Sequence, residues 1–318
     1  MKTKVIETMK SLAMPPALGG TRRGMDAGPV GHLSWYQAGP TAPDASTPPL
    51  LLLHSVNAAA SAYEVKPLYE HYASVRPVYA LDLPGFGFSD RSDRAYGPRL
   101  MTDALHAMLA VIRGESGGGP VDALAVSLSC EFLARAAVES PAGFRSLALV
   151  SPTGFNRKEL RDGPAGSTLG REAPLAILER LGLRRRVFGL LTRRGTIRYF
   201  LRRTWGSDDI DTGLLDYDFA TTRPEGAEYA PLRFVSGFLF SGDSGRLYRG
   251  LELPVWAVHG VRGDFVDYRG LGQTADRPNW TVTVLPTGAL PHFESPGEFI
   301  RQFDAWSARL SRVRSRPR

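Results

Sequence analysis

The sequence predicts an α/β protein: a mostly parallel sheet with helices on both faces and a helical insertion. Short apolar runs of strand length alternate with longer segments of helical period, which is the pattern that builds such a sheet. This alternation stops between Gly154 and about Leu251, where several short helical patterns follow one another without strands. The balance of 43% hydrophobic and 22% charged residues is that of a globular protein that folds without a partner.

Each strand is predicted from a short apolar run, and each helix from a longer periodic segment. The expected strands are 33–37, 50–54, 78–83, 121–126, 147–151, 255–259 and 281–285. The expected core helices are 61–72, 101–113, 128–139 and 296–310, and those of the insertion include 175–191 and 196–205. The last core helix has a clear start signal, because Ser295, Pro296 and Glu298 supply an N-cap, a first-turn proline and a capping-box acid.

These elements divide the chain into three parts. Residues 1–30 are rich in proline and glycine and are expected to form an N-terminal arm. Residues 31–153 and 252–318 form the α/β core, and residues 154–251 form the helical cap. The basic stretch 309–318 is expected to be a frayed tail.

Composition also bears on location. No apolar run approaches the ~20 residues that a membrane-spanning helix needs. The apolar stretch near the N-terminus is broken by charged residues and by Pro15-Pro16, so it lacks the core of a secretory signal. The single cysteine, Cys130, rules out an internal disulfide and is compatible with a reducing compartment. We therefore expect a cytoplasmic protein, whose oligomeric state the sequence leaves open.

The positive charge is concentrated in the cap. Of the formal net charge of +7, residues 155–205 carry thirteen Lys or Arg against four Asp or Glu. Such a segment can bind an anionic membrane or an acidic ligand, or it can be a solvated helical face. Peripheral contact with anionic membrane is therefore one expectation for the cap.

A serine lies between a predicted strand and a predicted helix. In Val121-Asp-Ala-Leu-Ala-Val-Ser-Leu-Ser-Cys130, the small residues Ala125 and Ser129 flank Ser127 two positions away on each side. A strand that turns directly into a helix needs small flanking residues and leaves the central hydroxyl exposed at the sheet edge. This arrangement suits a nucleophile. A helix-capping serine is the alternative, for which Ser127 and Ser129 are equally suitable.

Two further loops strengthen the first interpretation. Strand 50–54 runs into a loop led by His54, and Asp82-Leu-Pro-Gly-Phe-Gly-Phe-Ser89 follows the next strand. Together with the serine turn, these segments resemble the α/β-hydrolase family over about residues 30–155 and 250–310. The resemblance implies a mostly parallel, eight-stranded-type sheet with an inserted helical cap. It also implies a serine hydrolase that needs neither metal nor organic cofactor, with Ser127 as the nucleophile.

The resemblance further implies an oxyanion hole made of the backbone N–H groups of Leu128 and Val56. Such donors are worth on the order of 3 kcal/mol each in the transition state. Ser55 occupies a position where the family usually has glycine. Asn57 could add a side-chain donor to substrate or oxyanion, or it could stabilise the turn.

The acid and the base are expected later in the chain. Strand 255–259 runs into Gly-Val-Arg-Gly-Asp-Phe-Val-Asp267, which resembles the family's acid loop, with Asp264 the better match and Asp267 the alternative. The family's Gly-His-Leu-Pro-His-Phe-Glu pattern is similar to Gly-Ala-Leu-Pro-His-Phe-Glu here, so the usual histidine position is Ala289. Either His292 replaces that histidine as the base, or the base is lost and the protein binds without hydrolysing. His54 and His259 are expected to anchor loops.

The sequence therefore predicts attack of Ser127 on an ester-like carbonyl of a small molecule, with an acyl-enzyme intermediate and with His292 and Asp264 completing a triad. One alternative is a binding protein on the same scaffold, supported by Ala289. Another is a lipid hydrolase at membrane surfaces, supported by the arginines of the cap. Nucleic-acid binding is not expected, because the fold offers no groove-reading element.

Overall fold

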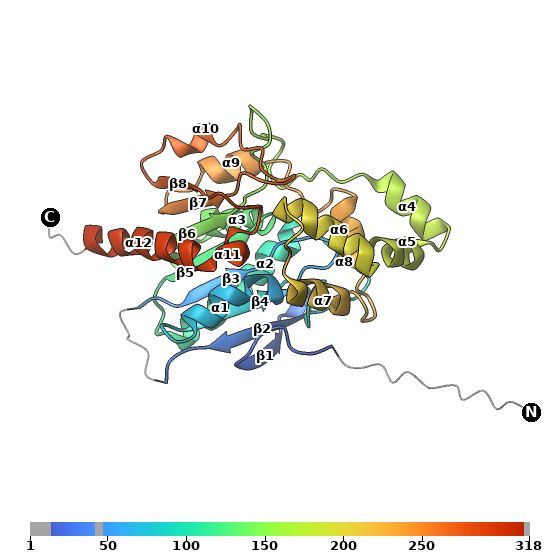
Figure 1. The fold of residues 1–318 in the computed structure, drawn as a ribbon, viewed down its shortest axis with the longest axis horizontal. Helices are drawn as coiled ribbons and strands as arrows, with labels where there is room; N and C mark the ends of the chain where they lie inside the picture. Colours follow the sequence, from blue (N-terminus) through green and yellow to red (C-terminus); the bar gives the residue numbers. More distant parts are fainter. Residues whose placement is uncertain (1–13, 42–46, 315–318) are drawn as a thin grey trace, which may run out of the picture.

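A computed structural model describes residues 14–41 and 47–314 (Figure 1). Eight strands form one sheet in the order β1-β2-β4-β3-β5-β6-β7-β8. The pairs β1–β2 and β2–β4 are antiparallel, and the remaining pairs are parallel. The strands are β1 Thr21–Asp26, β2 His32–Ala38, β3 Leu50–Leu53, β4 Val78–Asp82, β5 Val121–Val126, β6 Phe144–Val150, β7 Val255–His259 and β8 Trp280–Val284. The expected mostly parallel, eight-stranded α/β sheet is confirmed.

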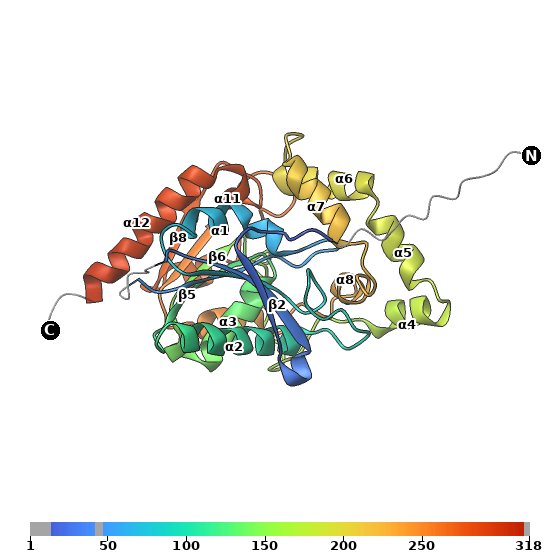
Figure 2. The same ribbon diagram turned by 90° about the horizontal axis from the view of Figure 1, so that it is seen from below.

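The sheet separates two hydrophobic cores. Every side chain of β3 is buried, because Leu51 and Leu53 point into one core and Leu50 and Leu52 into the other. Helices α2 (Pro98–Glu115) and α3 (Ser129–Glu139) cover the first face. Helices α1 (Lys66–Tyr72), α11 (Pro291–Glu294) and α12 (Pro296–Arg314) cover the second (Figure 2). Burial on both faces explains why the strands have continuous apolar runs.

The cap lies beside the sheet and beyond its helical layers, as Figures 1 and 2 both show. Its helices are α4 (Glu172–Arg180), α5 (Arg184–Leu191), α6 (Arg194–Trp205), α7 (Thr212–Thr221) and α8 (Tyr229–Val235). Apolar side chains of α6 and α7, among them Ile197, Trp205 and Leu215, join the core on the α1 side. The cap is therefore packed onto the core rather than joined to it only by its two connections.

One expected boundary of the cap needs correction. Helix α9 (Ser244–Arg249) packs on α3, and its side chains Leu247 and Tyr248 belong to the core on that face. The cap thus ends before α9 rather than at residue 251. Short helix α10 (Gly272–Ala275) and the 3-10 turns Gly28–Val30, Ala62–Val65 and Pro141–Gly143 complete the described elements.

The chain ends also differ from the expectation. Within the proposed arm 1–30, residues 1–13 lie outside the described part of the chain, but β1 adds an antiparallel edge strand to the sheet. Its exposed, polar sequence TRRGMD gave no apolar signal for a strand. Helix α12 continues to Arg314, so most of the expected tail is helical. No helix among the described residues is long and apolar enough to cross a membrane.

An ion cluster lies at the amino ends of the central strands β5 and β6. Asp122 on β5 accepts hydrogen bonds from Arg145, from Ser146 and, at 2.7 Å, from Arg76. Burial alone would raise the pKa of Asp122, but the hydrogen bonds and charges of the two arginines hold it below the usual value. The carboxylate therefore neutralises two arginines that are themselves largely removed from water.

We predict that Asp122→Ala lowers the free energy of unfolding by about 3–5 kcal/mol, because it removes the buried carboxylate to which two largely buried guanidinium groups donate. Urea unfolding at neutral pH measures the change. Asp208→Asn is the matched control, since Asp208 pairs with Arg202 while 81% of its side chain is exposed. Such surface pairs contribute about 0–1 kcal/mol. Equal losses in the two variants would contradict the assignment.

Candidate active site

Ser127 occupies a strained turn at the carboxyl end of β5. Its φ of 56° lies in the left-handed region, which is unusual for a residue other than glycine. Its N–H donates to the carbonyl of Val150 on β6 at 2.8 Å, so the sheet ladder continues up to the turn. The hydroxyl of Ser129 donates to the carbonyl of His54 and fixes the turn against the end of β3. Ser129 therefore has a structural role, whereas the side chain of Ser127 caps no helix.

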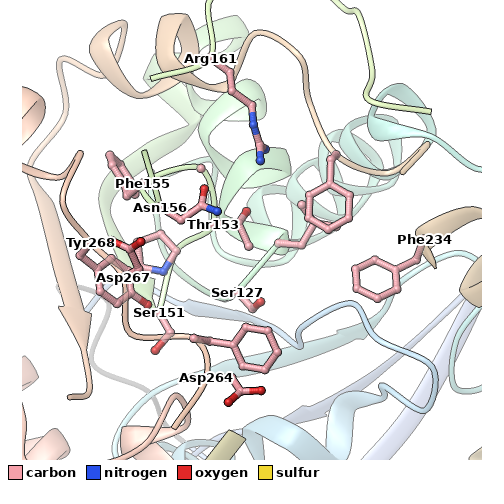
Figure 3. A pocket seen from close by; sticks show the side chains of 15 residues that line it. Ser127, Ser151, Thr153, Phe155, Asn156, Arg161, Phe234, Asp264, Asp267 and Tyr268 are labelled. Atoms are coloured by element: carbon pink, nitrogen blue, oxygen red, sulfur yellow. The ribbon is translucent and has the colours of Figure 1, made fainter. Parts of the chain in front are cut away.

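Ser127 faces a cavity of about 400 Å³ (Figure 3). Ser151, Thr153 and Phe155 line it from the end of β6 and the following loop. The loop after β7 contributes Asp264, Phe265, Asp267 and Tyr268, and the cap contributes Phe234 of α8. The remaining lining residues are Leu128, Pro152, Gly154, Asn156, Arg161 and Phe240. The cavity thus opens at the carboxyl edge of the sheet, where ligands of such folds bind.

Two backbone amides beside Ser127 remain without partners. Within the described residues, the N–H groups of Leu128 and Val56 donate to no acceptor. Leu128 also lines the cavity, whereas Val56 is buried in the loop after β3 and is not among the lining residues. Unpaired amides at a helix N-terminus are suited to stabilise developing negative charge. These are the two donors that the sequence comparison with the family indicated.

A buried glutamate shapes the loop that carries Val56. Glu64 accepts from the backbone N–H of Ser55 at 2.7 Å, from the Ser55 hydroxyl and from the side-chain amide of Asn57. Burial raises the pKa of Glu64, and these donors act in the opposite direction by favouring the charged form. Ser55, which replaces the family's usual glycine, supplies two of the three bonds.

The expectation that the side chain of Asn57 donates to the substrate or the oxyanion is wrong. Its amide nitrogen donates to Glu64 and to the Ser55 hydroxyl, and its amide oxygen accepts from the backbone of Ala59 at 2.7 Å. Both donors and the acceptor are thus used within the loop. Asn57 stabilises the turn, which was the alternative.

The prediction that His292 is the catalytic base is also wrong. Its ring is fully buried in α11, its Nε2 bonds to the backbone carbonyl of Glu64 at 2.8 Å, and its Nδ1 has no partner. It packs against Phe293 and Phe299 and does not line the cavity of Ser127. The physical reason is its position on α11, because this helix packs against α1 and the 3-10 turn Ala62–Val65, and His292 points into that contact. Burial lowers its pKa to about 4.

The two candidate acids reach the cavity but contact no histidine. Asp264 forms an ion pair with Arg203 of α6, and its own N–H donates to the Arg203 carbonyl at 3.1 Å. Asp267 pairs with Arg269, whose hydrogen bond holds the pKa of Asp267 below its usual value. Neither acid orients a base, so the predicted triad of Ser127, His292 and Asp264 is not assembled.

The end of α6 contacts the last loop at the family's usual histidine position. The N–H of Ala289, the family's usual histidine position, donates to the carbonyl of Thr204 at 2.9 Å. A Cβ atom on Gly288 would lie 2.5 Å from that same oxygen, so the last loop and α6 are in close backbone contact. The acid loop is tied to the last loop through Val261 and Thr287. The cap thus contacts both loops at this point.

The other histidines do not supply a base. His54 bonds to the backbone carbonyl of Ser55, and its Nε2 accepts from the N–H of Leu83, so it anchors two loops as expected. His259 bonds to the Gly260 carbonyl and stacks on Tyr268 with 3.9 Å between ring centroids. No histidine lines the cavity of Ser127. Among the described residues, no group of three or more His, Cys, Asp or Glu could hold a metal ion.

Sequence reasoning missed two residues of the site. Glu64 gave no signal, because a buried acid in a short 3-10 turn looks like any solvated acid of a helix start. Ser151 has a φ of 48° and lines the cavity. Its place directly after a buried strand, like that of Ser127, was the available signal.

The model of the alpha/beta hydrolase family matches residues 50–302, and the chain therefore belongs to this family. No curated protein sequence matches the chain.

Solved structures of the same fold include three informative neighbours. A probable hydrolytic enzyme from Pseudomonas aeruginosa has a TM-score of 0.69 at 18% identity, over 91% of this chain and 95% of that one. A serine hydrolase involved in carbazole degradation has a TM-score of 0.67 at 16% identity, over 91% and 99%. An esterase from Thermogutta terrifontis has a TM-score of 0.63 at 18% identity, over 92% and 99%. These likenesses establish the fold.

We predict that His292 makes the protein sensitive to acid. The unfolded chain binds a proton at this residue below about pH 6.5, whereas the folded chain does so only below about pH 4. Stability is therefore lost as the pH falls through this window, by up to about 3 kcal/mol. In His292→Gln, which can still donate to the Glu64 carbonyl, this loss should be absent, so its stability relative to the wild type should improve as the pH falls.

Urea unfolding between these pH values measures the effect, with His71→Gln as the control because His71 is exposed on α1. A constant stability difference between wild type and His292→Gln across the window would show that the folded protein readily protonates His292.

Proposed function

We propose that this protein is a serine hydrolase in which Ser127 attacks an ester-like carbonyl of a small molecule and forms an acyl-enzyme. The observation that carries the proposal is the turn of Ser127, which is in the left-handed conformation at a cavity that Leu128, with its unpaired amide, also lines. Such backbone strain costs on the order of 1–3 kcal/mol and is concentrated at functional sites. The hydrolase neighbours, the esterase among them, agree with this chemistry.

The missing histidine determines which esters can react. The Ser127 oxygen bonds to the carbonyl carbon, the amides of Leu128 and Val56 stabilise the oxyanion, and the bond to the leaving group breaks. Hydroxide from the solvent takes the serine proton and becomes water, and a water molecule later hydrolyses the acyl-enzyme to the free acid. Because no imidazolium protonates the leaving group, only groups that leave as stable anions are expelled quickly. Deacylation also lacks a general base and is therefore slow.

A binding protein on this scaffold is the second candidate. It is favoured by one observation, namely that no histidine lines the cavity of Ser127. The carboxylates that line it are held by arginines instead. In this case the cavity holds a small molecule without covalent chemistry.

We predict a burst with p-nitrophenyl acetate that approaches one nitrophenolate per chain, followed by slow turnover. The ethyl ester of the same acid should be inert because ethoxide is a poor leaving group. Since hydroxide replaces an imidazole base, the burst rate should rise across pH 6–9 without the plateau that a histidine near pH 7 gives. Stopped-flow absorbance measures the burst, and mass spectrometry of the fluorophosphonate-treated protein locates the modified serine.

Ser127→Ala should abolish burst and labelling, whereas Ser151→Ala is the matched control that removes another hydroxyl of the same cavity. The absence of burst and labelling in the wild type, with ligand binding retained, would favour the binding protein.

For the cap, we propose peripheral binding to anionic membranes. Exposed apolar side chains on and between α4, α5 and α6 lie among arginines, and they are Ile177, Leu181, Leu190, Tyr199 and Phe200. Arg185, Arg186, Arg193 and Arg198 are exposed and have no carboxylate partner among the described residues. Apolar residues that insert between headgroups, with basic residues around them, characterise interfacial helices. One structural neighbour is a membrane phospholipase A, with a TM-score of 0.64 at 19% identity.

We predict that the protein sediments with phosphatidylserine vesicles at low salt and dissociates as salt rises, since charges are screened beyond about 10 Å at 0.1 M. Replacing Arg185 and Arg186 together by glutamine should weaken binding about thirtyfold, at about 1 kcal/mol per basic residue. The control replaces Arg301 and Arg309 on α12, which lies on the opposite side of the molecule from the cap (Figure 1). Equal weakening of vesicle binding by both double variants would show that binding depends on net charge alone, and would contradict a binding surface on the cap.

A further inference from the structure

A second cavity lies between the cap and the core. Its volume is about 260 Å³, and its wall is mostly apolar. Helix α6 and the loop after β3 contribute most of the lining, which includes Ala59, Ile197 and Leu201. Phe234 and Phe265 line both this cavity and that of Ser127. Phe200, Val235 and Phe265 remain more than half exposed and form an apolar rim.

One acidic side chain interrupts this apolar wall. Asp218 of α7 lines the cavity, is only 3% exposed and makes no hydrogen bond or ion pair with any described residue. Its Oδ1 is completely buried and has no partner. An unsatisfied carboxyl group in an apolar site is costly, and such groups are retained where a ligand or a reaction uses them.

The electrostatic surroundings of Asp218 indicate what kind of ligand is missing. Burial raises the pKa of Asp218 well above its usual value, and the nearby Glu64 raises it further. Glu64 already accepts its three hydrogen bonds from uncharged donors. No lysine, arginine or histidine lines this cavity, and no cation pairs with either acid within the described residues. Asp218 and Glu64 are therefore two neighbouring buried acids without a cationic partner among the described residues.

We infer that this cavity binds an organic ammonium ion with an apolar body, whose nitrogen donates to Asp218. A cationic nitrogen satisfies the free carboxyl oxygen and neutralises the buried acid, which a neutral alcohol cannot do. The apolar body fits the lining from α6 and the loop after β3. Phe200, Phe234 and Phe265 add aromatic rings to this wall, against which the apolar body can pack. This inference concerns binding alone and holds whether or not Ser127 reacts.

Isothermal titration calorimetry with n-hexylamine and n-hexanol, which have the same apolar length, tests the inference. Wild-type protein should bind one n-hexylamine per chain, with n-hexanol at least about tenfold weaker. Asp218→Asn should lose this preference for the amine. The variant should fold, because Asp218 contributes no hydrogen bond, and thermal unfolding checks this. Asp216→Asn is the matched control on the same helix, where the side chain is 60% exposed and pairs with Arg194.

Ser127→Ala should retain amine binding, so failure of the proposed hydrolysis and failure of this site can be told apart. Ala59→Phe, which fills the cavity, should weaken amine and alcohol alike. Equal affinity of wild type for amine and alcohol would overturn the inference, as would unchanged amine binding by Asp218→Asn.

Discussion

The hydrogen bonds of Glu64 hold together the parts of the molecule on which the site depends. The carboxylate fixes Ser55 and Asn57 and thereby positions the loop that carries the Val56 amide. The backbone carbonyl of the same residue accepts from His292 and joins α11 to this loop. The charge of Glu64 also acts on Asp218 in the cap. A buried acid thus connects the loop after β3, the last loop and the cap, at the desolvation cost that its raised pKa reflects.

This arrangement explains why the conserved-looking pattern around His292 was misleading. The segment Leu290-Pro-His-Phe-Glu294 resembles the family motif, and its histidine is the one that the sequence pattern predicts for a triad. The structure shows instead that these residues form α11, whose histidine points down to Glu64. Sequence spacing located the loop correctly, but it could not give the direction of a side chain on a four-residue helix. A shift of three residues along the chain here moves a ring from the sheet edge into the core.

Other features could be predicted because they depend on local physics. The strand β5 and the turn at Ser127 follow from a buried apolar run and small flanking residues, and both β5 and β7 have the expected bounds. The strand β1 could not be predicted, since its side chains are exposed and its pairing with β2 is made by backbone. Helix α7 with Asp218 was also not predicted. Its apolar side chains are not confined to one face, so no helical period is visible there. The burial of Asp218 depends on tertiary packing, which the sequence does not show.

The cap has more than one effect on the site. Through Thr204 it occupies the backbone position next to Ala289, and through Arg203 it pairs with Asp264. It also brings Phe234 to the boundary between the two cavities, where Phe265 meets it from the core. A ligand anchored by its nitrogen at Asp218 would therefore end against the same two rings that line the cavity of Ser127. Both cavities share the side chains of Phe234 and Phe265, and Phe265 is 58% exposed, so rotation of its ring would change the shape of both.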